Sequence, residues 1–144
     1  MTAFIVFGHG SRIESANQAV RDAARQMAVS GRHTVEAAFL ELGEPDLAGA
    51  TERLIARGAT RIVVIPYFLT LGLHLHRDLP RLVEDISRQH PDVEMQVTAP
   101  LDGHPALVEA LLARASQAEA PGQAEAPTKA VAPSQTEAPT KARS

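Results

Sequence analysis

The 144-residue chain contains no cysteine and no tryptophan, and it has only one tyrosine and four phenylalanines. Without cysteine there are no disulfides, no thiolate chemistry and no cysteine-based zinc sites, which is typical of a reducing cytoplasm, where we expect this protein to reside. So few aromatic side chains cannot supply the stacking platforms of a single-stranded nucleic-acid binder. Any metal must therefore be held by histidine and carboxylate side chains.

The chain also lacks an excess of one charge and a long apolar run. Its formal net charge is −3 with both signs interspersed, so the broad basic surface of a nucleic-acid-binding protein is missing. No apolar run approaches the roughly 20 residues that cross a bilayer. Residues 1–7 have no basic lead-in and no small-residue cleavage site, and we predict a strand there and not a signal peptide. We expect neither nucleic acid nor a membrane as a partner.

Apolar runs and segments with helical spacing alternate four times along the chain. Strands are predicted at residues 4–7, 34–40, 61–66 and 93–98, each followed by a helix, the last at 106–115. This alternation predicts an α/β fold, a three-layer sandwich in which a four-stranded parallel sheet lies between helices.

Local signals predict where the first three helices begin. Ser15 and Gln18 have the spacing of a capping box. Pro45 suits the first turn of the second helix. Asp78 is expected to cap the third helix, with Pro80 in its first turn.

The composition changes from about residue 117. Ala-Pro pairs recur at 120–121, 126–127, 132–133 and 138–139, with polar residues between them and almost nothing apolar larger than alanine. Such a segment cannot bury enough apolar surface to offset the entropy of ordering it. We therefore predict one domain at residues 1–116 and a disordered Ala/Pro-rich tail at 117–144.

Side chains that can bind a metal follow three of the predicted strands. His9 lies between two glycines after the first strand, Glu41 follows the second, and His74 and His76 follow the third. Because parallel strands end at one edge of a sheet, and ligands bind beyond that edge, these residues are candidates for one site. Residues 74–76 are predicted to be extended, so that both imidazoles would face the same way. The other histidines are expected to be ordinary solvated residues: His33, His90 and His104.

Two histidines and a carboxylate form a ligand set suited to Co²⁺, Ni²⁺, Fe²⁺ or Zn²⁺, and imidazole also accepts protons near physiological pH. These residues also have interpretations without a function. The glycine-flanked turn around His9 is a common type of turn, and Glu41 could simply face solvent. Tyr67, Phe68 and Leu73 would ordinarily belong to the core, and alternatively they line an apolar pocket for a flat ligand.

Three motifs make the chain resemble the short, single-domain class II sirohydrochlorin cobaltochelatases and ferrochelatases. The motifs are Gly8-His9-Gly10-Ser11-Arg12 with Ala16-Asn17, then Ala38-Phe39-Leu40-Glu41 with Pro45, then Pro66-Tyr67-Phe68-Leu69 before Gly72-Leu73-His74, Asp78 and Pro80. They extend over about residues 3–112. Each motif is weak alone, and the three in this order are specific.

The resemblance implies a chelatase-like half-unit that pairs with a second copy as a homodimer. It implies ATP-independent insertion of a divalent metal, Co²⁺ or Fe²⁺ and alternatively Ni²⁺, into sirohydrochlorin or a related tetrapyrrole, in cobalamin or sirohaem biosynthesis. The metal is then a substrate, and no permanently bound cofactor is implied.

The resemblance also implies roles for individual residues. His9, His74 and Glu41 would be the catalytic and metal-binding residues, and His76 is an additional candidate ligand. Substrate contacts are expected from Gly10, Ser11, Arg12, Tyr67, Phe68 and Leu73.

Two other functions use the same residues. A metallochaperone or metal-storage module needs the histidines and the glutamate but no macrocycle. A phosphate-handling enzyme would cradle an anion at residues 8–12 or become phosphorylated at His9. Against the latter, no arginine precedes His9 and no Lys-Ser ending follows the glycines.

Overall fold

A computed structural model of the protein describes residues 1–69 and 72–120, with only the backbone described at Leu73 and His74. The chain divides into two compact units, the first of which is Met1–Asp102. In chain order the elements are β1 (Thr2–Gly8), α1 (Glu14–Gly31), β2 (Thr34–Phe39), α2 (Leu47–Ala56), β3 (Arg61–Pro66), α3 (Leu73–Gln89), β4 (Glu94–Val97) and α4 (Pro105–Glu119).

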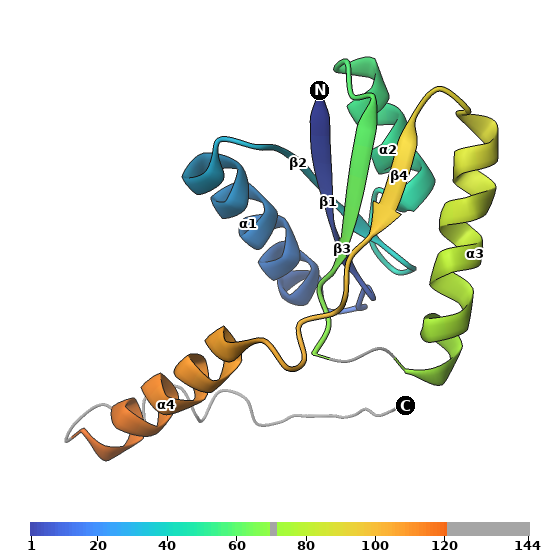
Figure 1. The fold of residues 1–144 in the computed structure, drawn as a ribbon. Coiled ribbons are helices and arrows are strands. Elements are labelled where there is room, and N and C mark those ends of the chain that lie inside the picture. The colour runs from blue at the N-terminus through green and yellow to red at the C-terminus, as the bar shows by residue number, and fades with distance from the viewer. Residues whose placement is uncertain (70–71, 121–144) are drawn as a thin grey trace. The chain divides into compact units, whose positions relative to one another are not determined.

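The first unit is a four-stranded sheet in the order β2-β1-β3-β4, and every neighbouring pair is parallel. Helix α1 lies on one face of the sheet, and α2 and α3 lie on the other (Figure 1). The predicted α/β fold with a four-stranded parallel sheet is confirmed. All four strands end at the same edge, called here the carboxyl edge, where a parallel sheet binds its ligands.

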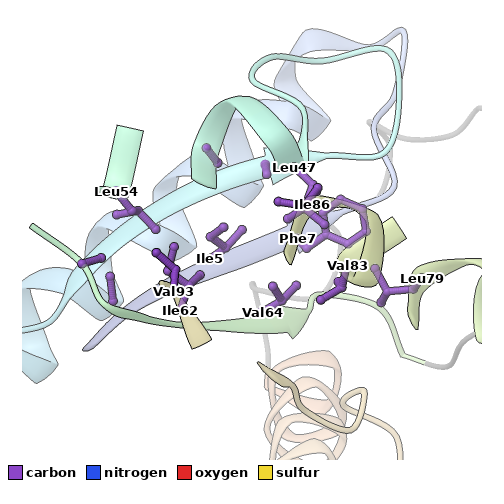
Figure 2. Close-up of a cluster of buried hydrophobic side chains, with 14 residues drawn as sticks. Ile5, Phe7, Leu47, Leu54, Ile62, Val64, Leu79, Val83, Ile86 and Val93 are labelled. Atoms are coloured by element: carbon purple, nitrogen blue, oxygen red, sulfur yellow. The ribbon is translucent and has the colours of Figure 1, made fainter. Parts of the chain in front are cut away.

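The larger core cluster lies between the sheet and helices α2 and α3. Alternate residues of the central strands, such as Ile5 and Phe7 of β1, point to this face (Figure 2). Because side chains alternate along a strand, Val6 points to the other face, where it packs with Ala24 of α1. Burying a side chain as large as Ile5 contributes about 1.5–3 kcal/mol. The sheet is thus fixed from both sides and supports the loops at its carboxyl edge.

Two predicted helix starts are wrong. Helix α1 begins at Glu14 after Ile13, so Ser15 lies inside its first turn and does not cap it. Helix α2 is capped by Asp46, whose carboxylate accepts a hydrogen bond of 2.8 Å from the backbone N–H of Gly49, and Pro45 precedes the helix. Pro45 is held outside α2 because its carbonyl accepts a hydrogen bond of 2.9 Å from the N–H of Phe39, and the turn before α1 is held by a hydrogen bond of 3.0 Å from the N–H of Ile13 to Oγ of Ser11.

The third helix differs most from the prediction. Helix α3 starts at Leu73, five residues before the expected cap, so residues 74–76 are helical and the predicted extended segment is wrong. The reason is packing, because Leu75 lies against the larger core cluster one helical turn before the buried Leu79. Continuing the helix places both leucines on one face.

Pro80 therefore lies inside α3 and not in its first turn. Proline has no backbone N–H, so the helix lacks the hydrogen bond that would end on the carbonyl of His76. Asp78 is an exposed residue of the helix and not its cap.

The described part of the second unit is helix α4. The Nδ1 atom of His104 accepts a hydrogen bond of 3.0 Å from the backbone N–H of Ala106, which explains His104 by local structure, as expected. The helix runs past the predicted end at residue 115, because alanine, glutamine and glutamate at 115–119 favour helix. Residues 121–144, most of the predicted tail, lie outside the described residues. Within the described ranges, no helix is long and apolar enough to cross a membrane.

Candidate active site

The first two strands hold the backbones of His9 and Glu41 together at the carboxyl edge. Past the end of β1, the N–H of Leu40 donates to the carbonyl of Gly8 at 3.0 Å, and the N–H of Glu41 donates to the carbonyl of His9 at 3.2 Å. On the other side of β1, the N–H of Tyr67 donates to the carbonyl of Phe7 at 2.8 Å. His9 therefore lies between the segments that follow β2 and β3.

Gly10 allows the two loops to come this close. Its φ angle of +95° lies in the region that favours glycine. A Cβ atom at this position would lie 1.6 Å from the carbonyl oxygen of Glu41, so no side chain fits. Gly10 is expected to let a ligand come close to the backbone. Its missing side chain also lets the loop that carries Glu41 come close.

The imidazole of His9 lies edge-on to the ring of Phe68. The two ring centroids are 6.2 Å apart and the planes are at 80°. Phe68 in turn packs edge-on against the buried Phe7, with centroids 6.2 Å apart. Phe68 is half-buried and therefore contacts the core on one side and the exposed His9 on the other.

The loops at the carboxyl edge, including those that carry His9 and Glu41, also carry exposed apolar side chains. They form what we call the apolar rim, with exposed fractions from 37% to 66%: Ile13, Leu40, Leu42, Tyr67 and Leu69. All five belong to the loops that follow β1, β2 and β3. An exposed apolar cluster beside polar groups is typical of a ligand-binding or protein-binding surface.

Two hollows lie along the carboxyl edge. Glu41 lines one of about 490 Å³, together with residues of the loop that leads to α2. His76 lines another of about 570 Å³, with Leu79, Pro80 and the segment that follows β4. His76 is therefore an exposed residue of a hollow beside β4, while His74 is placed only by its backbone in the first turn of α3.

The other predicted substrate-binding residues occupy the loop after β1. Arg12 is exposed, and Ser11 is half-buried, with its Oγ accepting a hydrogen bond of 3.0 Å from the backbone N–H of Ile13. The backbone of Ser11 is also engaged within the protein, by Asn17. Among the side chains that the structure describes, no three histidines, aspartates or glutamates lie close enough to hold a metal ion.

Arg21 of α1 fixes the far side of the loop that carries Glu41. Its guanidinium donates to the carboxylate of Glu14 at 2.6 Å and to the carbonyl of Glu44 at 3.2 Å, and it lies 5.1 Å from the centre of the Phe39 ring. The hydrogen bond from Arg21, followed by that from Asn17, lowers the pKa of Glu14. Glu14 therefore stays ionised to lower pH, and its contribution to stability is lost only as the pH falls through the lowered value.

Asn17 is a residue of the site that sequence reasoning noted only as part of a motif. Its side chain is 2% exposed and contacts both loops of the site. One signal was available, because Asn17 shares a helix face with Val20 and Ala24, and a polar residue at such an inward position needs hydrogen-bonding partners.

The fold and site define a class of α/β protein that presents histidine and glutamate at the carboxyl edge of a parallel sheet, within an apolar rim. The CbiX family model matches residues 3–118. The chain belongs to the CbiX family of chelatases, which confirms the resemblance carried by the three sequence motifs.

Individual relatives give the extent of the similarity. The chain is 34% identical over 106 residues to the chloroplastic sirohydrochlorin ferrochelatase of Arabidopsis thaliana, covering 73% of this chain and 47% of that protein. It is 30% identical over 139 residues to the sirohydrochlorin cobaltochelatase of Methanopyrus kandleri, covering 82% of this chain and 97% of that protein. The chain thus spans about half the length of the plant relative and nearly all of the archaeal one.

A solved structure shows the same fold. The cobalamin (vitamin B12) biosynthesis CbiX protein from Marinobacter aquaeolei superposes with a TM-score of 0.72 at 26% sequence identity, and the match covers 81% of this chain and 95% of that chain. The fold is therefore one that a single short chain forms.

Proposed function

We propose that this protein inserts Co²⁺ or Fe²⁺ into sirohydrochlorin or a closely related tetrapyrrole, without ATP. The observation that carries the proposal is the backbone hydrogen bond between His9 and Glu41 at the carboxyl edge, on loops that also carry residues of the apolar rim. The family supports it, since relatives carry the names sirohydrochlorin cobaltochelatase and sirohydrochlorin ferrochelatase. Ni²⁺ is the third metal that a histidine and carboxylate set would accept.

The chemistry requires a temporary metal ligand and a base. A divalent metal loses its bound water and forms bonds to the pyrrole nitrogens, and two pyrrole protons leave as it enters. In our proposal His9 and His74 serve as metal ligand and proton acceptor, one of them in both roles in turn, and the carboxylate of Glu41 assists. The ligand set must remain open enough to release the metal to the macrocycle.

The apolar rim would hold the flat macrocycle. Tyr67 is 41% exposed and lies next to Phe68, whose ring contacts the imidazole of His9. Apolar and aromatic walls with a few placed polar groups are typical of small-molecule sites. We propose that Tyr67, Phe68 and Leu73 contact the ring system, and that Gly10, Ser11 and Arg12 contact its periphery.

We further propose that the active form is a homodimer, in which the sheet edges of two copies face each other. The lengths of the relatives support this. The chain spans 47% of the plant ferrochelatase, so two copies would together match that protein in length, and it spans 97% of the archaeal cobaltochelatase. Exposed leucines in the rim are also suited to a protein interface. We expect sedimentation equilibrium at micromolar concentration to give twice the mass of the chain. A monomer with full activity would contradict the dimer and leave the chelatase proposal standing.

The function is tested by mixing purified protein with sirohydrochlorin and one metal at a time, Co²⁺, Fe²⁺ or Ni²⁺, under anaerobic conditions. We expect the absorption spectrum to change faster than in the mixture without protein, with Co²⁺ or Fe²⁺ the best substrate. A metal-binding module without chelatase activity would bind Co²⁺ without accelerating this change.

The helical conformation of residues 74–76 leads to a separate expectation about the two histidines. Positions two apart on a helix lie about 200° apart around its axis, so positions 74 and 76 belong to different faces of α3. We expect His74→Ala to lower the insertion rate by about 100-fold or more, and His76→Ala to retain a nearly wild-type rate. The reverse result in initial-rate measurements would move the site to His76 and its hollow beside β4.

A further inference from the structure

We propose that Asn17 is a positioning residue that fixes the loop carrying His9 against the loop carrying Glu41. The proposal rests on the function proposed above for His9 and Glu41. Asn17 itself lies in the first turn of α1, beneath both loops.

The amide of Asn17 joins the two loops by hydrogen bonds. Its Oδ1 accepts from the backbone N–H of Ser11 at 2.9 Å, and its Nδ2 donates to the carbonyl of Ser11 at 2.9 Å. The same Nδ2 donates to the carbonyl of Leu42 at 2.8 Å. Ser11 is two residues after His9, and Leu42 directly follows Glu41, so one side chain holds both segments within two residues of the proposed catalytic groups.

The loop after β2 has an unusual conformation where Asn17 binds it. Leu42 has a φ angle of +57°, which is unfavourable for a residue with a branched side chain. Residues held in sparsely populated backbone conformations tend to occur at functional sites, where the surrounding structure maintains them. The hydrogen bond from Asn17 ends on the carbonyl of Leu42, and Leu42 is 51% exposed in the apolar rim.

The next residue shows how closely the loop and Asn17 fit. A Cβ atom at Gly43 would lie 3.1 Å from Nδ2 of Asn17 and 2.9 Å from the ring of Phe39. The loop therefore approaches the amide as closely as a glycine allows. Close approaches at two glycines thus accompany the hydrogen bonds of Asn17, since Gly10 lies against the carbonyl of Glu41 and Gly43 against the amide of Asn17.

Packing alone does not explain an asparagine here. Its face of α1 continues with Val20 and Ala24, which pack on Val6 and Ala37, and an apolar residue would extend that cluster without the cost of burying an amide. The other buried polar residue of the described core is Thr51, whose hydroxyl donates to the carbonyl of Leu47 within its own helix at 2.8 Å. Thr51 is therefore a matched control for a buried hydrogen bond without a positioning role.

The experiment compares Asn17→Ala and Asn17→Asp with Thr51→Val in the full chain. Asn17→Asp keeps the size of the side chain and the acceptor for Ser11, but it places an oxygen against the carbonyls of Ser11 and Leu42. Two properties are measured. One is the Co²⁺ dissociation constant without tetrapyrrole, from visible absorption, and the other is hydrogen exchange at the backbone amides of Ser11 and Glu41.

We expect both Asn17 variants to weaken Co²⁺ binding by about 10- to 100-fold, the range found when residues that orient metal ligands are changed. The amides of Ser11 and Glu41 should exchange faster, and Thr51→Val should change neither property even where it lowers thermal stability equally. Variants of Asn17 that match Thr51→Val in Co²⁺ affinity and in amide exchange would overturn the proposal.

The outcomes also separate this proposal from the function. If the wild type inserts no metal but Asn17→Ala still loosens both amides and weakens Co²⁺ binding, the chelatase proposal fails and the positioning role stands. If the wild type is active and Asn17→Ala behaves as Thr51→Val does, the positioning role fails and the function stands. If the wild type binds no Co²⁺ without tetrapyrrole, hydrogen exchange at the backbone amides of Ser11 and Glu41 alone tests the positioning role.

Discussion

Replacing His9 by alanine is expected to lower the rate of metal insertion by about 100-fold or more, because it removes the proposed ligand or base from the centre of the site. The backbone of His9 is bonded to Glu41 and its ring contacts Phe68, so this residue links the two halves of the described site. Initial rates with sirohydrochlorin and Co²⁺ measure the effect. The fold should persist, since the side chain of His9 is exposed.

His33→Ala is the matched control for this change. His33 is also an exposed histidine, but it precedes β2 at the opposite edge of the sheet, where its ring lies 4.7 Å from that of Phe4. We expect His33→Ala to insert metal at the wild-type rate. Equal rates for His9→Ala and the wild type would remove His9 from the mechanism.

Gly10→Ala is expected to disturb the site through its backbone. Its new methyl group would lie 1.6 Å from the carbonyl of Glu41, and the φ angle of +95° disfavours any residue but glycine. The loop that carries Glu41 must then move away from His9. We expect the insertion rate to fall by about tenfold or more, and backbone strain to cost about 1–3 kcal/mol in the free energy of unfolding.

Gly58→Ala is the control that separates the effect of backbone strain from the effect of the steric clash with Glu41. Gly58 has a similar φ angle of +101°, but a Cβ atom there would meet nothing within 4 Å, and it lies after α2. We expect Gly58→Ala to lower stability in urea unfolding and to leave the insertion rate unchanged. A Gly10→Ala protein that is less stable but fully active would show that the contact with Glu41 does not set the geometry of the site.

The centre of the sheet could be predicted from the sequence because β1 and β3 are buried on both faces along most of their length. The strand Arg61–Pro66 has both of its predicted ends, because a short run of β-branched residues bounded by turns is typical of a buried parallel strand. The pairing of His9 with Glu41 follows from the same pattern, because parallel strands that neighbour one another deliver their ends to one edge.

Helix starts could not be predicted as well, because local capping signals compete with packing. Asp78 has the chemistry of a cap, but burial of Leu75 against the core extends α3 by five residues before it. This single packing contact also changes the relation between His74 and His76, from two positions on one side of a strand to two positions far apart around a helix.

Asn17 shows why part of the site is hidden from sequence reasoning. Its partner Leu42 is 25 residues away along the chain, and the hydrogen bond between them exists only once the sheet and α1 are in place. A polar residue on an inward helix face indicates that some partner is needed, but it does not identify which one.

The initial rate of Co²⁺ insertion into sirohydrochlorin, followed by absorption with and without the wild-type protein, tests the central claim most directly. Our account predicts a rate that rises in proportion to protein concentration and far exceeds the rate without protein. A rate equal to that of the mixture without protein, for Co²⁺, Fe²⁺ and Ni²⁺ alike, would contradict it.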